Sequence, residues 1–483
     1  MFPYPFGFLK SGVAEDPAFI IKVKTDNAGT SNNDQFTIPT SGGGYNYDID
    51  WGDSSTDTGQ TGNITHTYPA DYEYIIKITG TFPGIRFDNG GDKLKLLEIQ
   101  NWGNHVYTVL ESAFYGCTNM DITATDEADF SSIIDWGEGF RNCTSLTTTG
   151  LSANWVSSNC TKLDITFYNC TSLVTLDASN WDTSNCTTFY LAFYNCVDLA
   201  GAFNVSSWDT GKVTTFNQTF LNCKDITSIS VDNWDVSSCD NFAKMFKNCI
   251  SLTTIPVDNW DTSSGTNFLD MFRDCDNLTT LDLEDWDMSS ATTIQAMFYT
   301  DTNLTTIGDV DGWDTSSMIT MQYAFAQCGK LVINVSSWDT SSNANLNETF
   351  NSLSGTGSIT GYQNWNVSSV TTFKRIFKAC DSSNVATFPS TWDMRVATTL
   401  YEMIRDWDVI TGSIDCSNMQ WDSSLTNMQK WCYSNPGLTD ITFGSNNDFS
   451  GVTTMQEMFG ACTNLTDVTW DAGLDLSALT IAT

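Results

Sequence analysis

Of the residues that could carry acid–base or metal chemistry, histidine is scarce in this chain and carboxylates are abundant. Two of its 483 residues are histidines, His66 and His105, which leaves almost no material for a histidine-based triad, a zinc site or an acid–base pair. The sequence contains no Walker loop and no Gly-x-Gly-x-x-Gly entering a helix. Carboxylates are abundant, but in an acidic repeat they pair by chance and do not indicate glycoside hydrolysis. We therefore expect a protein that is not an enzyme and needs no cofactor or metal.

Cysteine is a second candidate for chemistry, but its spacing indicates packing. Ten of the fifteen cysteines recur in one frame, which predicts a buried stack of small apolar side chains. No Cys-x-x-Cys or Cys/His set indicates metal binding. The column comprises Cys117, Cys143, Cys170, Cys196, Cys223, Cys249, Cys275, Cys328, Cys380 and Cys462. A shorter column holds Cys160, Cys186 and Cys239, in which Cys160 and Cys186 would be close enough for a disulfide in an oxidising setting.

Aspartates form a third column, because one follows most of the tryptophans. Stacked carboxylates about 5 Å apart repel by roughly 1–3 kcal/mol each, so something must offset the repulsion. Each carboxylate either accepts N–H bonds at the start of a helical turn or belongs to a row of bound Ca²⁺ ions, and we favour the first. The same alternatives hold for Asp48, Asp50 and Asp53. The column comprises Asp182, Asp209, Asp235, Asp261, Asp287, Asp314, Asp339, Asp393 and Asp422.

These columns all follow one period in the sequence. Ten tryptophans succeed each other at nearly constant steps. A fixed period of about 26 residues predicts a solenoid of stacked coils, which grows along one axis without needing a new core. The series is Trp155, Trp181, Trp208, Trp234, Trp260, Trp286, Trp313, Trp338, Trp365 and Trp392.

One coil can be followed from Leu278 onward. Leu281 and Leu283 alternate with polar residues, which predicts a short strand with both side chains inward. Ile294, Met297 and Phe298 recur at intervals of three and four, which predicts a short helix on the opposite flank. We therefore expect each coil to contribute one strand, one turn and one short helix, with the strands paired in parallel.

Strand patterns precede the solenoid. The segments AFIIKVKT, QFTIPT, YNYDIDWGD and ITHTYPADYEYIIKITG, joined by Gly-, Ser- and Asp-rich stretches, predict an antiparallel β-sandwich. The residues Asp50, Trp51, Gly52 and Asp53, followed by 66–68 (His-Thr-Tyr), resemble the WGDG…HTY signature of polycystic-kidney-disease (PKD) repeats, although position 54 is serine. That resemblance implies an immunoglobulin-like spacer or adhesion domain.

The repeats themselves resemble the BspA-like leucine-rich-repeat surface proteins, whose repeat runs close to LTTLDLSNWDTSSVTTMxxMFxxC. The best matches are SLVTLDASNWDTSNCTTFYLAFYNC (172–196) and NLTTLDLEDWDMSSATTIQAMF (277–298). The resemblance covers nearly 400 residues. It implies an extracellular attachment module without catalytic residues, and the combination with a PKD-like domain also resembles fibre proteins of bacteriophages.

The predicted fold class is thus an all-β immunoglobulin/PKD-like sandwich followed by an α/β leucine-rich-repeat solenoid, with a parallel sheet on one face and short helices on the other. The expected divisions are an N-terminal docking arm over 1–14, the sandwich over 15–88, a solenoid of about 14 coils over 89–470, and a C-terminal end over 471–483.

The charge and hydropathy of the chain limit the kinds of partner that it can bind. The formal net charge is −36, with 57 acidic and 21 basic residues, which argues against nucleic acid and anionic membranes. No apolar run of about 18 residues predicts a membrane span. The first residues lack the basic and apolar regions of a secretory signal, so we expect export by another route, as for a virion component.

Aromatic residues outside the repeat frame are the candidate contact points. Phe2, Tyr4, Phe6 and Phe8 alternate with proline or glycine, and either pack on the next domain or dock on a virion protein. Trp407, Trp431 and Tyr433 lie where the repeat weakens, and either fill the core or contact a receptor. The apolar C-terminal end predicts self-association, since an open solenoid end needs covering.

Taken together, the sequence predicts a virion-surface attachment protein of a bacteriophage. It would be held by its arm to other virion proteins and would present the solenoid to a protein or glycan of the host surface. Two alternatives stay open, a bacterial BspA-like cell-surface adhesin and a purely structural virion decoration. All three place the protein outside a cell.

Overall fold

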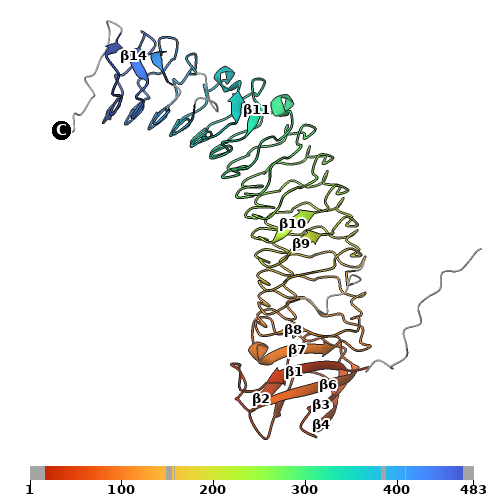
Figure 1. The fold of residues 1–483 in the computed structure, drawn as a ribbon. Coiled ribbons are helices and arrows are strands. Elements are labelled where there is room, and N and C mark those ends of the chain that lie inside the picture. Colours follow the sequence, from red (N-terminus) through yellow and green to blue (C-terminus); the bar gives the residue numbers. More distant parts are fainter. Residues whose placement is uncertain (1–16, 148–154, 157, 382–387, 408–409, 471–483) are drawn as a thin grey trace, which may run out of the picture.

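The structure, a computed structural model, describes residues 17–147, 155–156, 158–381, 388–407 and 410–470. Figure 1 shows a curved rod, in which stacked coils of chain rise from a β-rich N-terminal end. We use "coil" for one repeat of the solenoid. The predicted solenoid is confirmed, with about 14 coils between residues 98 and 469.

The N-terminal end is built on one six-stranded sheet, in the order β4-β3-β6-β1-β7-β8. Strands β1, β3, β4 and β6 pair antiparallel. β7 joins β1 antiparallel and β8 pairs with β7 in parallel, so the sheet continues directly into the first coils. The bounds are β1 (Phe19–Lys24), β3 (Asn46–Asp50), β4 (Thr56–Gln60), β6 (Glu73–Thr81), β7 (Leu96–Asn101) and β8 (Asp121–Ile122).

A second, two-stranded sheet pairs β2 (Gln35–Ile38) with β5 (Ile64–Thr67). Polar side chains tie it to the first coil around the 3-10 turn η1 (Lys93–Lys95). The buried Lys95 ammonium donates to the Gln35 carbonyl at 2.8 Å. The structure does not show the predicted sandwich as a separate unit, because pairing and polar contacts both continue past residue 88 into the solenoid.

Consecutive coils pair in parallel in the rest of the chain. Where the pairing is extensive it forms short strands, and elsewhere it forms single bridges such as Thr280 to Thr306. The strand groups are β9 (Gly201–Phe203) with β10 (Ile226–Ile229), β11 (Val332–Asn334) with β12 (Ser358–Thr360), and β13 (Gly412–Asp415) with β14 (Leu438–Thr442) and β15 (Asp467–Thr469).

The predicted short helices are wrong. The only helical elements in the described residues are three-residue 3-10 turns, η1, η2 (Val310–Gly312) and η3 (Tyr362–Asn364). An α-helix needs each N–H to donate four residues back along the same chain. In this chain the pattern differs. Backbone N–H groups that donate to a carbonyl of their own coil alternate with N–H groups that donate to a carbonyl of the next coil.

The segment with Ile294, Met297 and Phe298 illustrates why. The Met297 N–H donates to the Ile294 carbonyl at 3.0 Å, three residues earlier. The Ala296 N–H donates instead to the Gln322 carbonyl of the next coil at 2.8 Å. Ala296 has a φ of 53°, in the left-handed region that ends a right-handed helix. The apolar spacing of three and four is therefore produced by stacked tight turns.

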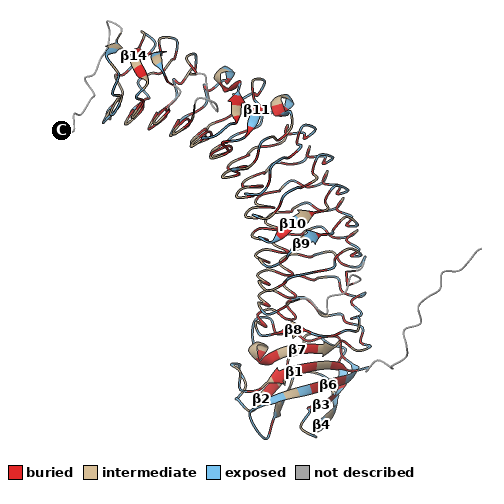
Figure 2. Cartoon of the chain, in the orientation of Figure 1, coloured by how far each residue is buried: buried red, intermediate tan, exposed pale blue. Residues whose placement is uncertain are grey.

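The core of the rod consists of aromatic stacks that run along its axis. Trp234, Trp260 and Trp286 stack with ring centroids 6.3 and 6.1 Å apart and planes within 6° of parallel. Phe246 and Phe272 stack similarly at 5.9 Å. Figure 2 shows buried positions along the whole length of the rod. Each coil thus buries its apolar residues against the next, which is why the repeats must stack to fold.

Candidate binding surface

The predicted core residues lie where the coils stack, and most of their polar atoms make hydrogen bonds there, although the buried Trp181 indole N–H has no partner among the described residues. The Trp260 indole N–H donates to the Val231 carbonyl of the preceding coil at 3.0 Å. The Cys275 thiol donates to the Phe246 carbonyl at 3.1 Å. None of the predicted set is more than 3% exposed, so these residues serve cohesion between coils. The set is Trp181, Trp208, Trp234, Trp260, Trp286, Trp313, Cys196, Cys223, Cys249 and Cys275.

The aspartates that follow the tryptophans fold back on their own chain. Asp261 Oδ1 accepts the Ser263 N–H at 3.1 Å, and Asp314 and Asp339 make the same bond two residues on. Hydrogen bonds from the Ser263 hydroxyl and N–H lower the pKa of the Asp261 carboxyl. Each carboxylate is therefore used in a turn of the chain, although no helix follows it. In the described ranges, no group of three Asp, Glu, His or Cys side chains could hold a metal ion.

One side of the rod, which we call the strand face, carries the outward side chains of segments 227–232, 253–258, 279–284 and 305–308. A hollow of about 560 Å³ lies over these segments. Ile255 and Leu281 are buried and line it together with the exposed Asp232 and Asp282. It therefore combines a small apolar surface with carboxylates that face solvent.

The hollow coincides with a gap in the parallel ladder. Bridges join Ser228 to Thr254 and Thr280 to Thr306, whereas no described bridge joins Thr254 to Thr280. Pro256, which lines the hollow, has no N–H to give to such a ladder. Residue 308 is glycine with a φ of 80°, and a Cβ there would lie 2.8 Å from Asp282 Oδ1. Proline and glycine together thus keep this part of the face open.

The carboxylates of the strand face have no cationic partner among the described residues. Asp232, Asp258, Asp282 and Glu284 on this face, and Asp285 directly after it, are exposed, and in the part of the chain that the structure describes none of them forms an ion pair. A second hollow, of about 360 Å³, adjoins Asp258 and Asp285. This face therefore presents unneutralised negative charge around two depressions.

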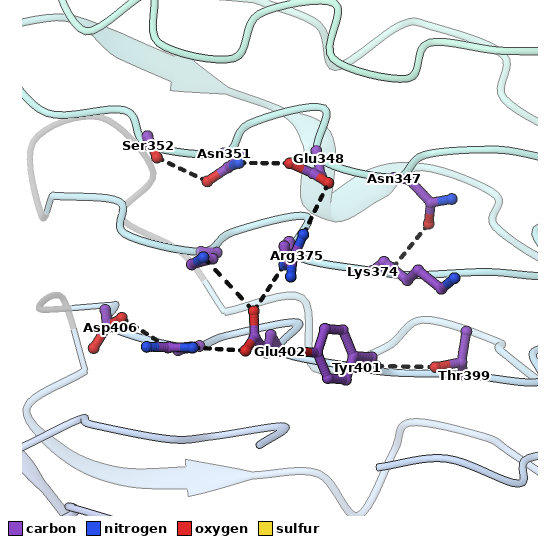
Figure 3. A network of polar contacts seen from close by, with 12 residues as sticks. Asn347, Glu348, Asn351, Ser352, Lys374, Arg375, Thr399, Tyr401, Glu402 and Asp406 are labelled. Carbon is purple, nitrogen blue, oxygen red and sulfur yellow. Dashed lines mark hydrogen bonds and ion pairs between the residues drawn. The ribbon is translucent and has the colours of Figure 1, made fainter. Parts of the chain in front are cut away.

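The segments of stacked tight turns, such as 346–353, 373–380 and 400–407, form what we call the turn face, where charges are paired. Figure 3 shows Glu348, Arg375 and Glu402 on three successive coils, with their charged ends directed toward one another. Arg375 Nε lies 2.7 Å from Glu402 Oε2, and Arg405 Nη1 lies 2.6 Å from Glu402 Oε1. Alternating charges in one column therefore join coil to coil.

Glu402 is the centre of this network and its side chain is only 2% exposed. Burial raises the pKa of its carboxyl, but hydrogen bonds from Arg375 and Arg405 outweigh burial and lower that pKa to about 2. Asp270 is similarly enclosed, with Lys247 Nζ at 2.8 Å and Arg273 Nη1 at 3.3 Å. Sequence reasoning missed this network, although the alternation of acidic and basic residues in one repeat frame, at 348, 375 and 402, could have indicated it.

A histidine, a serine and an aspartate do meet at the N-terminal end. His66 Nε2 lies 2.8 Å from Asp53 Oδ2 and 3.3 Å from Ser55 Oγ. In a nucleophilic triad the serine and the carboxylate contact different ring nitrogens, whereas here both contact the same one. The His66 ring also stacks on Trp51 at 4.7 Å. This arrangement fastens the turn between β3 and β4 to β5.

Two of the three candidate receptor contacts lie in the core. Trp407 and Trp431 are both fully buried, which agrees with the first of the two alternatives given for them, that they fill the core. Trp407 lies one coil after Cys380, in the cysteine column. Trp431 lies one coil after Met403, because the Ile404 N–H donates to the Trp431 carbonyl as the Phe377 N–H donates to the Met403 carbonyl. Tyr433 is partly exposed, but the Arg405 guanidinium lies 5.1 Å from its ring centre.

The predicted docking residues Phe2, Tyr4, Phe6 and Phe8 lie outside the described residues. The described part of the chain contains no helix with the length and apolarity that a membrane crossing requires.

Two family models match the repeats of this chain. The model of the family described as "Mycoplasma protein of unknown function, DUF285" matches residues 108–228, 192–307 and 300–416, and the chain belongs to this family. The model described as "BspA type Leucine rich repeat region (6 copies)" matches residues 409–476. The repeats near the C-terminal end thus match a BspA-type leucine-rich repeat region. No curated protein matches it.

Two solved structures align with the chain at low similarity. A leucine-rich repeat protein from Bacteroides ovatus ATCC 8483 is 14% identical, with a TM-score of 0.26, and the alignment covers 83% of this chain and 87% of that one. The TLR13–ssRNA13 complex is 11% identical with a TM-score of 0.24, and the alignment covers 77% of this chain but only 46% of TLR13. The comparisons give no support to a PKD-like domain or to a bacteriophage context.

Proposed function

We propose that this protein is a non-enzymatic adhesin of a bacterial cell surface, which binds a protein or glycan of a host surface through its strand face. The observation that carries the proposal is the contrast in charge pairing. Carboxylates are paired and buried on the turn face, but around the hollow at 229–308 they are exposed and form no ion pair with any described residue. A BspA-like repeat region supports the surface location.

A rigid support favours this use of the strand face. The aromatic stacks, the indole and thiol hydrogen bonds and the paired charges all join adjacent coils. The side chains around the hollow are therefore held in fixed positions before any partner arrives. Binding to a preorganised surface saves the conformational entropy that ordering would cost.

Absence of catalysis is part of the proposal. The histidine that has both a serine and a carboxylate as neighbours, His66, contacts both through one nitrogen and lies under Trp51. The sequence-based prediction of a virion protein is set aside in favour of the cell-surface adhesin, because the family matches support only the latter.

The test is adsorption of the fluorescently labelled full chain to cultured epithelial cells and to a glycan array. The variant pair is Asp232→Asn with Asp282→Asn, which removes two charges and keeps the oxygen that accepts the Glu284 N–H. The matched control is Asp225→Asn, which alters an exposed carboxylate outside the hollow. We expect the double variant to bind at least several-fold less and the control to bind normally. Equal binding by all three proteins, or no binding by the wild type, would overturn the proposal.

A further inference from the structure

Two cysteines of the shorter column meet sulfur to sulfur across adjacent coils. Cys160 and Cys186 are both buried, and their sulfur atoms lie 3.6 Å apart across adjacent coils. Cys186 Sγ also lies 3.5 Å from the Cys160 carbonyl oxygen. In the longer cysteine column, by contrast, the thiols from Cys143 onward are directed at a carbonyl of the preceding coil, as Cys196 is at the Phe167 carbonyl at 3.2 Å.

We propose that Cys160 and Cys186 form a covalent cross-link site, which an external disulfide converts into a Cys160–Cys186 disulfide during folding. Adjacent strands lie about 4.8 Å apart, within the range of Cα separations that a disulfide spans. The backbones on either side are held in register, since the Thr187 N–H donates to the Thr161 carbonyl at 3.0 Å. Rotation of the two side chains has only to bring the sulfurs from 3.6 Å to bonding distance.

The oxidant that we name is a low-molecular-weight disulfide such as oxidised glutathione. One cysteine thiolate attacks it, forms a mixed disulfide and releases one glutathione thiolate. The second cysteine thiolate then attacks the protein sulfur of that mixed disulfide and releases the second glutathione. Two thiol protons leave, two electrons pass to glutathione, and one S–S bond replaces another. Because both sulfurs are buried in the folded chain, the exchange belongs to the folding stage.

The third member of the column provides a control. Cys239 occupies the same place in its coil and is equally buried, but the coils on either side carry Val213 and Gly265 there. Its thiol has no cysteine neighbour and lies 3.7 Å from the Asn241 carbonyl oxygen. Cys239 thus occupies the same position in its coil as Cys160 and Cys186, but unlike them it has no cysteine sulfur beside it among the described residues. The inference does not depend on the proposed function.

The test uses the full chain, reduced in denaturant and refolded in a buffer of reduced and oxidised glutathione. Free thiols are then blocked with iodoacetamide, and the protein is digested and analysed by mass spectrometry. We expect one cross-linked peptide pair containing Cys160 and Cys186, with a mass lower by about 2 Da than the two free peptides together. Thirteen cysteines should be alkylated and these two protected.

Single cysteine-to-serine variants test which residues form the cross-link. Cys160→Ser and Cys186→Ser should each abolish the cross-link, and Cys239→Ser should leave it intact. The link closes a loop of about 26 residues, so the unfolding equilibrium constant of the oxidised wild type should be lower than that of the reduced form by about 10²-fold or more. Alkylation of all fifteen cysteines in the refolded wild type would overturn the proposal, and so would a link between any other pair. Both outcomes are read on the wild type, whether or not a variant folds.

Discussion

The strand face and the turn face of the rod use the same residue types for different purposes. On the turn face, Glu402 is enclosed by Arg375 and Arg405, and Asp270 by Lys247 and Arg273. On the strand face, carboxylates such as Asp232 and Asp282 surround a hollow without an ion-pair partner in the described chain. The comparison teaches that charge in this solenoid joins coils where it is buried, and stays available to partners where it is exposed.

The largest expected effect is on the turn face. Glu402→Gln removes the charge that two guanidinium groups share and leaves both without their nearly buried partner. Breaking a buried pair from one side costs about 3–5 kcal/mol. Urea unfolding should show this loss. Glu457→Gln is the matched control, since Glu457 takes the same place in its coil but is 47% exposed, and it should cost no more than about 1 kcal/mol.

A smaller effect, in the stabilising direction, is expected in the core between the faces. Asp301 replaces a cysteine in the column, is fully buried, and its Oδ2 has no hydrogen-bond partner. Asp301→Cys restores the thiol of the neighbouring coils, and should raise the free energy of unfolding by about 1–3 kcal/mol at neutral pH. Urea midpoints of the two proteins measure the gain, and a lower midpoint for the variant would contradict it.

The pH dependence of this gain has a definite sign. Burial raises the pKa of the Asp301 carboxyl well above its ordinary value, so the folded state holds a proton that the unfolded state releases above about pH 4. Wild-type stability should therefore fall as pH rises above that value. The advantage of Asp301→Cys should be greater at pH 7 than at pH 4.

A change in backbone tests how the hollow is kept open. Gly308→Ala places a Cβ at a φ of 80° and 2.8 Å from Asp282 Oδ1, which should cost about 1–2 kcal/mol. Gly312→Ala is the matched control, because Gly312 has ordinary φ and open space around its Cα. Thermal unfolding of the two variants should separate them, and equal melting temperatures would show that the glycine at 308 is not needed for its conformation.

The smallest of these effects concerns the aspartate turns beside the strand face. Asp261→Ala removes the acceptor of the Ser263 N–H and should cost about 0.5–1 kcal/mol. Asp261→Asn keeps Oδ1 and should cost less. Because the pKa of Asp261 is lowered in the folded state, its contribution is present above the unfolded pKa of about 4 and lost as pH falls through the folded value. Unfolding midpoints at pH 7 and pH 3 check both statements.

The sequence predicts the repeat of this fold better than its local geometry. The period follows from the tryptophans, and the inward alternation of Leu281 and Leu283 follows from their spacing. Helices were predicted because spacing of three and four suits both a helix and a stacked tight turn. The distinguishing signal is the residue before each cysteine, often asparagine, which tolerates the left-handed conformation seen at Asn195 and Asn222.

The candidate site was less predictable, because it depends on register between coils. Trp407 and Trp431 look exceptional along the chain, but counting one coil onward from Cys380 places Trp407 in a core column. The hollow arises from Pro256 and Gly308 on different coils. Neither residue is unusual by itself, and only their alignment across the ladder opens the surface.

The division between the two faces is tested most directly by urea unfolding of Asp232→Asn/Asp282→Asn beside Glu402→Gln. The account predicts that two neutralised carboxylates on the strand face shift the free energy of unfolding by less than about 0.5 kcal/mol, as surface changes usually do. One neutralised carboxylate on the turn face should lower it by about 3 kcal/mol or more. Equal losses in the two proteins, or a larger loss for the strand-face pair, would contradict the account.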